Sequence, residues 1–166
     1  IALFAQQASV RDAAAEFRAG AAAIDVTPKE FPLNMPGGFN ANFANSAHDP
    51  LHSRALVMAD GKATVAMVVV DSLGVSPAAI EEAKAIAAKS TGIPTNRMLI
   101  CSTHTHSAPR SGGAEIDGPD AAYRKLLVAG MAESIVKAHA ALEPAGFGAA
   151  SHPLGEEVFN RRWFLK

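Results

Sequence analysis

The fold is decided by residues 64–102, which read TVAMVVVDSLGVSPAAIEEAKAIAAKSTGIPTNRMLICS. Residues 65–70 are apolar without alternation, a pattern typical of a strand covered on both faces. Ser76 can cap a helix that ends at Gly92, and a second apolar strand follows at residues 98–102. This order of strand, helix and strand predicts a parallel crossover unit in an α/β fold.

Further strands and one more helix flank this unit. The turn Asp60-Gly61-Lys62 separates two extended runs at residues 54–59 and 64–71, which predicts a hairpin. A second helix is expected from Pro119 to a point before Pro144. Short strands are predicted at residues 24–27, 146–151 and 158–164, and the buried side of the first helix at Ile80, Ala83, Ile86 and Ala87. The predicted fold class is an α/β layered sandwich, in which a mixed β-sheet flanked by helices forms part of a larger catalytic domain.

Composition limits the class of protein. The 166 residues fit one domain, and they could equally be one piece of something larger. The formal net charge is -1 and no basic run is present, so nucleic acid is excluded as a partner. No apolar run approaches the roughly 18 residues of a membrane span.

The first residues carry no chemistry. Residues 1–19 are interpreted as a peripheral segment, with a short alanine-rich helix at residues 10–17, and residues 20–166 as the functional unit. Residues 1–8 resemble the end of a signal peptide, which predicts a secreted or periplasmic protein, although an expression scar has the same pattern.

Two imidazoles follow the second strand of the crossover unit, in Ser102-Thr-His-Thr-His-Ser-Ala-Pro109. If the backbone stays extended, His104 and His106 point to one face at the carboxyl end of the strand, where ligands of α/β folds tend to bind. Neutral imidazole suits zinc, but a catalytic zinc site takes three protein ligands, so others must come from elsewhere. The alternative is a hydrogen-bonded histidine pair without metal.

Other polar residues are weaker candidates. Asp71 ends the preceding strand, where its carboxylate could orient an imidazole, sit near a metal or cap residues 72–74. Cys101 is interpreted as a small buried hydrophobe. His48 and His52 have helical spacing, but Pro50 between them argues against a helix. Asn160-Arg161-Arg162 could bind an anionic or polarised group, or form a solvated basic turn. His139 and His152 are interpreted as surface or boundary residues.

The irregular stretch at residues 32–50 is long for a loop inside a compact domain. Such a loop is often functional, and disorder is the competing interpretation. Phe31, Phe39 and Phe43 could form one wall of an apolar groove.

At this point several motifs resemble one family. The run HDPLHSRALV from His48, the strand ending at Asp71, the Thr-His-Thr-His-Ser-x-Pro segment and Asn160-Arg161 occur in the order expected of neutral/alkaline (non-lysosomal) ceramidases. The resemblance covers roughly residues 20–166 and corresponds to the amino-terminal part of the catalytic domain.

The resemblance implies a zinc amidase that cleaves the N-acyl bond of ceramide. It implies that His104 is a zinc ligand, that His106 lies beside the metal, and that Arg161 binds substrate. It also implies that a second histidine, a glutamate and a tyrosine complete the zinc site from downstream residues or another chain. A lipid or other small-molecule substrate follows, and peripheral membrane contact is compatible with it.

The sequence therefore predicts a zinc-dependent hydrolase of an amide bond, with His106, Arg161 and Asp71 as catalytic candidates and His104 as metal ligand. Two alternatives remain: a non-catalytic scaffold or interaction domain with an incomplete metal site, and a zinc esterase on the same fold.

Overall fold

The computed structural model describes residues 16–38, 40–109 and 118–158. The predicted helix at residues 10–17 lies almost wholly outside this part of the chain. The same holds for most of the strand predicted at residues 158–164. Within the described residues, no helix is both long and apolar enough to cross a membrane.

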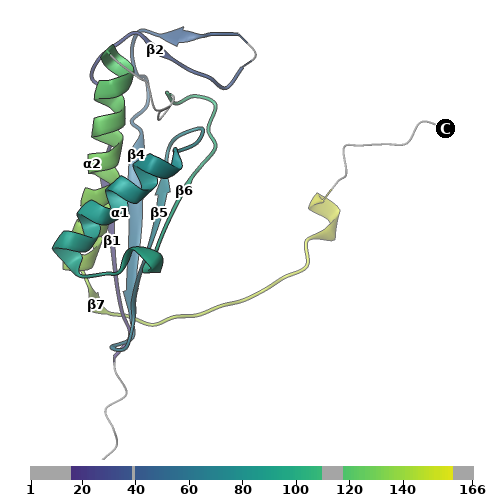
Figure 1. The fold of residues 1–166 in the computed structure, drawn as a ribbon. Coiled ribbons are helices and arrows are strands. Elements are labelled where there is room, and N and C mark those ends of the chain that lie inside the picture. Colours follow the sequence, from purple (N-terminus) through teal and green to yellow (C-terminus); the bar gives the residue numbers. More distant parts are fainter. Residues whose placement is uncertain (1–15, 39, 110–117, 159–166) are drawn as a thin grey trace, which may run out of the picture.

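The body of the protein is one mixed sheet with two helices against it (Figure 1). The sheet has five strands in the order β6-β5-β4-β1-β7. These are β1 (Arg18–Asp25), β4 (His52–Ala59), β5 (Thr64–Val70), β6 (Met98–Ser102) and β7 (Glu143–Pro144). Strand β1 begins earlier than the sequence pattern at residues 24–27 indicates. The α/β class with a mixed sheet is confirmed.

The predicted hairpin and crossover unit are both present. Strands β4 and β5 pair antiparallel across Asp60, whose carboxylate accepts hydrogen bonds from the amides of Lys62 and Ala63. These amides hold the pKa of Asp60 below its usual range. Strand β5 then leads through helix α1 to β6, which pairs with β5 in parallel.

Helix α1 (Pro77–Thr91) begins and ends where the sequence predicts. The side chain of Ser76 accepts a hydrogen bond from the amide of Ala79, and Gly92 takes the left-handed conformation that ends the helix. Its buried residues are Ala79, Ala83 and Ala87. The prediction that Ile86 is buried is wrong, because this side chain lies on the solvent side of the helix.

Helix α2 (Gly118–Ala140) packs lengthwise against the sheet and beside α1. Two glycines allow the close approach: a β-carbon on Gly130 would overlap Val26, and one on Gly20 would overlap the carbonyl oxygen of Ala138. The core between the layers contains Val57, Val68 and Val70 of the sheet and Leu127, Met131 and Ile135 of α2.

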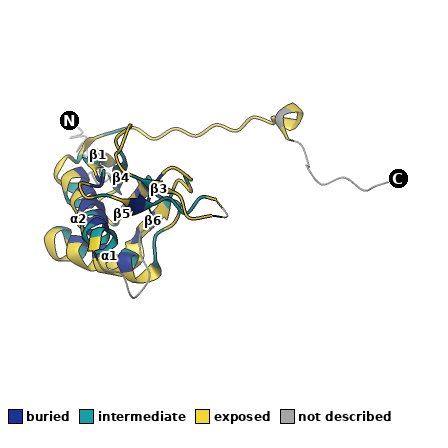
Figure 2. Ribbon diagram, turned by 90° about the horizontal axis from the view of Figure 1, so that it is seen from above, coloured by how far each residue is buried: buried dark blue, intermediate teal, exposed yellow. Residues whose placement is uncertain are grey.

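Only one face of the sheet is covered by helices (Figure 2). Strand β5 alternates between buried and exposed residues, so the prediction that both of its faces are covered is wrong for the described residues. Cys101, predicted to be buried, is exposed on the open face. Apolar composition alone cannot tell a strand that is covered on one face from a strand that is covered on both. The burial of each face depends on which helices or strands, distant in the sequence, pack against it.

Two further segments lie outside the layered body. Residues 32–50 form a loop with the short pair β2 (Leu33–Asn34) and β3 (Phe43–Ala44). After β7 the chain runs away from the sheet, and this segment contains the short helix η2 (Gly155–Glu157), as Figures 1 and 2 show. The strand predicted at residues 146–151 is absent. Another short helix, η1 (Thr95–Arg97), precedes β6.

Candidate functional site

The candidate site is built on the ends of two neighbouring parallel strands. Val70 and Ser102 are paired at the end of the β5–β6 ladder, and the amide of Thr103 still donates to the carbonyl of Val70 over 3.0 Å. Both chains then leave the sheet at the same level. The turn after β5 and the histidine segment after β6 therefore lie side by side.

His104 is fixed by the turn after β5. Its Nδ1 atom lies 2.7 Å from the carbonyl oxygen of Leu73 and donates the hydrogen bond, because a carbonyl can only accept. This tautomer leaves Nε2 with a free lone pair, which is the form of imidazole that binds a metal. The His104 side chain is otherwise exposed to solvent.

The backbone at His104 differs from the sequence prediction. The strand ends at Ser102, and His104 has φ of 59°, in the left-handed region. The extended geometry predicted to align the two histidines is therefore wrong. The two rings nevertheless meet edge to face, with their centroids 5.4 Å apart and the ring planes at 74°. A backbone turn, and not strand alternation, brings the imidazoles together.

Asp71 lies at the end of β5 and is held by strand β4. Its Oδ2 atom accepts hydrogen bonds from the amide of His52 over 2.9 Å and from Nη1 of Arg54 over 2.7 Å. Nη2 of Arg54 also lies 3.3 Å from Nδ1 of His52. The Asp71 carboxylate thus binds groups of β4. The sequence made Asp71 a candidate for orienting an imidazole, but the carbonyl of Leu73 orients His104 instead.

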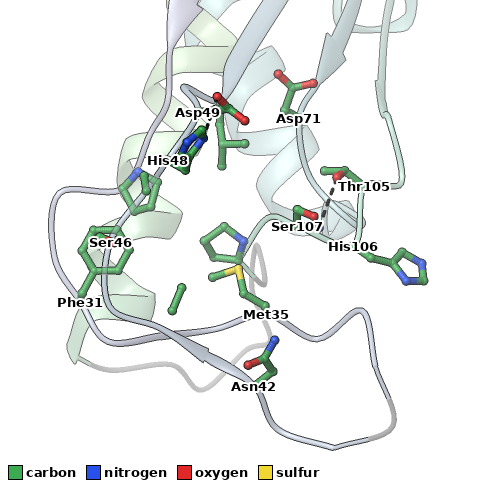
Figure 3. Close-up of a pocket in the computed structure, with 15 residues that line it drawn as sticks. Phe31, Met35, Asn42, Ser46, His48, Asp49, Asp71, Thr105, His106 and Ser107 are labelled. Carbon is green, nitrogen blue, oxygen red and sulfur yellow. Dashed lines mark hydrogen bonds and ion pairs between the residues drawn. The ribbon is translucent and has the colours of Figure 1, made fainter.

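A cavity of about 570 Å³ opens between the histidine segment and the loop at residues 32–50. Figure 3 shows Asp71, Thr105 and Ser107 on one side of it and Phe31 and Met35 on the other. The His106 backbone borders the cavity, while its imidazole points away from the other labelled side chains. Phe31 thus lines the cavity as predicted for the wall, Phe43 is exposed and is not among the lining residues, and Phe39 lies outside the described residues.

Gly37 brings the long loop into contact with the histidine segment. A β-carbon on Gly37 would overlap the Cα and Cβ atoms of His106, whereas Gly38 has open space around it. The loop can pass this close only because Gly37 has no side chain. The loop is therefore packed against the candidate site, which favours a functional role over disorder.

The remaining candidates are dispersed. His48 is exposed and pairs with Asp49, with 3.0 Å between Nδ1 and Oδ1. His52 begins β4, so the region contains no helical histidine pair, as Pro50 predicted. His139 lies half-buried in α2, and His152 is exposed. Arg161 lies outside the described residues.

The described residues contain no cluster of three or more His, Cys, Asp or Glu side chains that could hold a metal ion. His104 fits the role of a single metal ligand, because its tautomer is set and its Nε2 atom is free. A complete three-ligand metal site that includes His104 therefore needs at least one ligand from outside the described residues.

Sequence reasoning missed three contributors to this site. Leu73 acts through its backbone, so no side-chain pattern could reveal it. Arg54 could have been found as a single cation inside an apolar strand. Gly37 lies in Pro36-Gly37-Gly38, whose composition indicates a turn but not the close approach to His106.

Comparison with known proteins gives structural matches only. No protein-family model and no curated protein matches the sequence. The structure superimposes on neutral ceramidase from Pseudomonas aeruginosa with a TM-score of 0.64 and 23% sequence identity. The fold is that of part of a neutral ceramidase. The match covers 78% of this chain and 22% of the bacterial enzyme.

A second solved structure, a ceramidase complexed with C2, gives a TM-score of 0.59 at 21% identity, again over 78% of this chain and 22% of the other. The chain therefore spans less than a quarter of the ceramidases it matches. The expected resemblance to this family, and to a part of a larger domain, is confirmed at the level of the fold.

Proposed function

We propose that this chain is part of a zinc-dependent hydrolase that cleaves the amide bond of a ceramide-like lipid. The observation that carries the proposal is the hydrogen bond from His104 Nδ1 to the Leu73 carbonyl, which leaves Nε2 free. The three residues that follow His104 line the cavity. The shared fold with neutral ceramidases supports the substrate class. The remaining zinc ligands come from further polypeptide or another chain.

His104 is the residue that would hold zinc. A bound zinc ion supplies Lewis acidity, which polarises a scissile carbonyl and activates water near neutral pH. The carbonyl of Leu73 prevents the imidazole from turning and fixes which nitrogen carries the proton. Ligand histidines generally need such a partner for their second nitrogen.

His106 is assigned a role in proton transfer or hydrogen bonding. Its ring contacts that of His104, and an imidazole can exchange a proton near neutral pH. Asp71 lines the cavity with its charge compensated by Arg54. By resemblance, Arg161 would bind a polar group of the substrate.

The cavity fits the proposed substrate in its chemistry. Phe31, Met35 and Leu51 give it apolar wall, while Asp71, Thr105 and Ser107 contribute polar groups near the histidines. An acyl chain could lie along the apolar side with its amide toward the polar side. This division is typical of sites that bind a largely apolar ligand through a few polar contacts.

The test is zinc content and hydrolysis in the purified protein in its natural full-length form. We expect stoichiometric zinc and release of fatty acid from an N-acyl sphingosine, both lost in His104→Ala. His152→Ala, an exposed histidine in the segment after β7, is the matched control and should retain both. Absence of zinc from the wild-type protein would contradict the proposal.

The same measurements of zinc content and hydrolysis distinguish two other functions. A non-catalytic scaffold is favoured by the lack of a three-ligand cluster among the described residues, and it predicts neither zinc nor hydrolysis. A zinc esterase predicts zinc that depends on His104, with cleavage of the matched O-acyl substrate and none of the amide.

A further inference from the structure

The turn that carries the Leu73 carbonyl is held at its start by strand β4. Asp71 begins this turn, and its amide donates to the carbonyl of His52 over 2.9 Å. The amide of His52 donates in return to Oδ2 of Asp71, also over 2.9 Å. The main chain and the side chain of Asp71 are therefore both bound to the same residue of β4.

Arg54 binds the same carboxylate oxygen. Its Nη1 atom lies 2.7 Å from Oδ2 of Asp71, and the Asp71 side chain is only 18% exposed. A hydrogen bond between two charged groups at this distance is stronger than one between neutral groups. Without Arg54, the His52 amide would be the one remaining donor to this carboxylate among the described residues.

Arg54 also binds the ring of His52. Its Nη2 atom lies 3.3 Å from Nδ1 of His52. Because a guanidinium group can only donate, Nδ1 is the acceptor, and the proton of the neutral ring is on Nε2. Arg54 thus bridges the side chains of His52 and Asp71, which are the two residues that fix the start of the turn.

The surroundings of Arg54 set it apart from an ordinary surface charge. It lies on the sheet face that the two helices leave open, opposite Val69 in the β4–β5 ladder. Val69 and Leu56, the next residue of β4 on this face, are both exposed and apolar. A cation in this position is explained by its two specific contacts and not by a generally charged surface.

A short series of contacts connects Arg54 to His104. Asp71 and Leu73 are separated only by Ser72, whose buried hydroxyl donates a hydrogen bond within the turn. The carbonyl of Leu73 then accepts the hydrogen bond from Nδ1 of His104. Because the turn is this short, a displacement of Asp71 moves the carbonyl that orients the imidazole.

We propose that Arg54 is a positioning residue for His104, the residue assigned above as the zinc ligand. It acts through Asp71, because it fixes the start of the turn whose Leu73 carbonyl selects the tautomer of the imidazole. The inference rests on the proposed function in taking His104 as a metal ligand. Residues that orient a ligand histidine in this way affect metal affinity without contacting the metal.

The first test observes the His104 tautomer and needs neither zinc nor hydrolysis. The natural full-length protein is freed of metal by a chelator and labelled with nitrogen-15 in its histidine rings. At a pH where the imidazoles are neutral, long-range proton–nitrogen correlation spectra distinguish a protonated Nδ1 from a protonated Nε2. We expect a protonated Nδ1 at His104, identified by the loss of its signals in His104→Ala.

Arg54→Gln should shift the His104 signals toward a mixture of the two tautomers, because the Leu73 carbonyl is no longer held in place. The matched control is Arg97→Gln, an exposed arginine of η1, which should give the wild-type spectrum. An ion pair with a purely structural role would leave the tautomer unchanged. Identical His104 signals in Arg54→Gln and wild type, or a protonated Nε2 in the wild type, would overturn the proposal.

The second test measures zinc affinity by competition with a chromophoric chelator. Arg54→Gln should lower the affinity by about tenfold, and Arg97→Gln should not change it. Arg54→Lys keeps the charge but cannot bridge two acceptors with a planar fork, so it should recover only part of the affinity. Equal affinities of Arg54→Gln and wild type would overturn the proposal. Circular dichroism verifies folding, and Arg54→Lys is compared with wild type if Arg54→Gln does not fold.

A double variant tests whether Arg54 acts through Asp71. Asp71→Ala removes the carboxylate that Arg54 binds, so Arg54→Gln should change the His104 tautomer less in that background than in the wild type. Additive effects of the two changes would overturn the proposal. Failure of the proposed function has a different result: a protein that binds no zinc still reports the His104 tautomer, and the role of Arg54 is judged on that signal.

Discussion

The Nδ1 atom of His104 lies 2.7 Å from the carbonyl oxygen of Leu73, although 31 positions separate them in the sequence. The contact joins the turn after β5 to the segment after β6. Its acceptor is a main-chain atom, so substitution of the Leu73 side chain leaves the acceptor in place. The orientation of the imidazole therefore depends on the shape of the turn at residues 71–74.

Ser72 supports that turn, and its loss should weaken metal binding. Its buried hydroxyl donates to the carbonyl of Gly74 over 3.0 Å. We expect Ser72→Ala to lower zinc affinity by about 10-fold, the lower end of the effect seen for residues behind metal ligands. Competition with a chromophoric chelator measures the affinity. Ser72→Thr, which keeps the hydroxyl, should recover part of it, and equal affinities of Ser72→Ala and wild type would contradict the assignment.

Gly37 should be sensitive to a single added methyl group. A β-carbon there would overlap backbone and side-chain atoms of His106, so the loop or the histidine segment must shift. We expect Gly37→Ala to reduce kcat/KM by about 10-fold or more, as small misplacements of catalytic groups do. The adjacent Gly38→Ala is the control, since its nearest neighbour would be 3.9 Å away. Similar kinetics for the two variants would show that the contact is unimportant.

Gly130 should be required for the packing of α2 on β1. Alanine favours a helix over glycine by about 1 kcal/mol, but here its β-carbon would overlap Cγ1 of Val26. Overpacking typically costs about 1–3 kcal/mol, so Gly130→Ala should lower the free energy of unfolding. Urea denaturation measures the change.

The cause can be isolated with a double variant. Val26→Ala removes the overlapping methyl groups, so Gly130→Ala should cost less in that background than in the wild type. Strict additivity of the two changes would contradict steric overlap as the cause.

Tyr123 should tolerate loss of its hydroxyl group. Burial, and next the charge of Asp71, raise the pKa of Tyr123 above its usual value. The hydroxyl has no hydrogen-bond partner among the described residues. Since an unpaired buried hydroxyl is unfavourable, Tyr123→Phe should leave the free energy of unfolding unchanged or raise it by up to about 1 kcal/mol. A decrease in the free energy of unfolding of more than about 1 kcal/mol, measured by urea denaturation, would reveal a partner for the hydroxyl.

Asp25 should make stability depend on pH in the acidic range. The hydroxyl and then the amide of Thr27 donate to this carboxylate and hold its pKa below the usual value. The stabilisation is therefore fully present above the unfolded pKa of about 3.9, and it is lost as the pH falls through the lower folded pKa. Asp25→Asn should accordingly be less stable than wild type at neutral pH, and the difference should shrink as the pH falls below the unfolded pKa of the carboxyl group. A stability difference that does not change with pH would contradict this linkage.

Local signals in the sequence predicted the elements that local chemistry determines. Asp60-Gly61 specified the hairpin, and Ser76 with Gly92 specified both ends of α1. The open sheet face was not predictable in this way. Val65, Met67 and Val69 have the composition of a doubly covered strand, and only tertiary packing reveals that one face lacks a cover in the described residues.

The sequence predicted where the candidate site lies, but it did not predict the backbone conformation and hydrogen bonds that form the site. The histidine segment was identified by its residues, but alternation gave the wrong backbone for His104. The hydrogen-bond acceptor at Leu73 has no sequence signature, because every residue carries a carbonyl group. The position of Arg161 stays a prediction, since it lies outside the described residues.

The parallel pairing of β5 and β6 has a consequence for how this protein can vary. Val70 and Ser102 end the β5–β6 ladder as a pair, so the turn after β5 and the segment after β6 both start from the same level of the sheet. Helix α1 follows the turn that leaves this edge, and the chain re-enters the sheet at Met98, at the opposite end of β6. Insertions, deletions or redesign in α1 and η1 can therefore accumulate without altering the distance between Leu73 and His104, whereas a slip of one residue in the β5–β6 register would separate them.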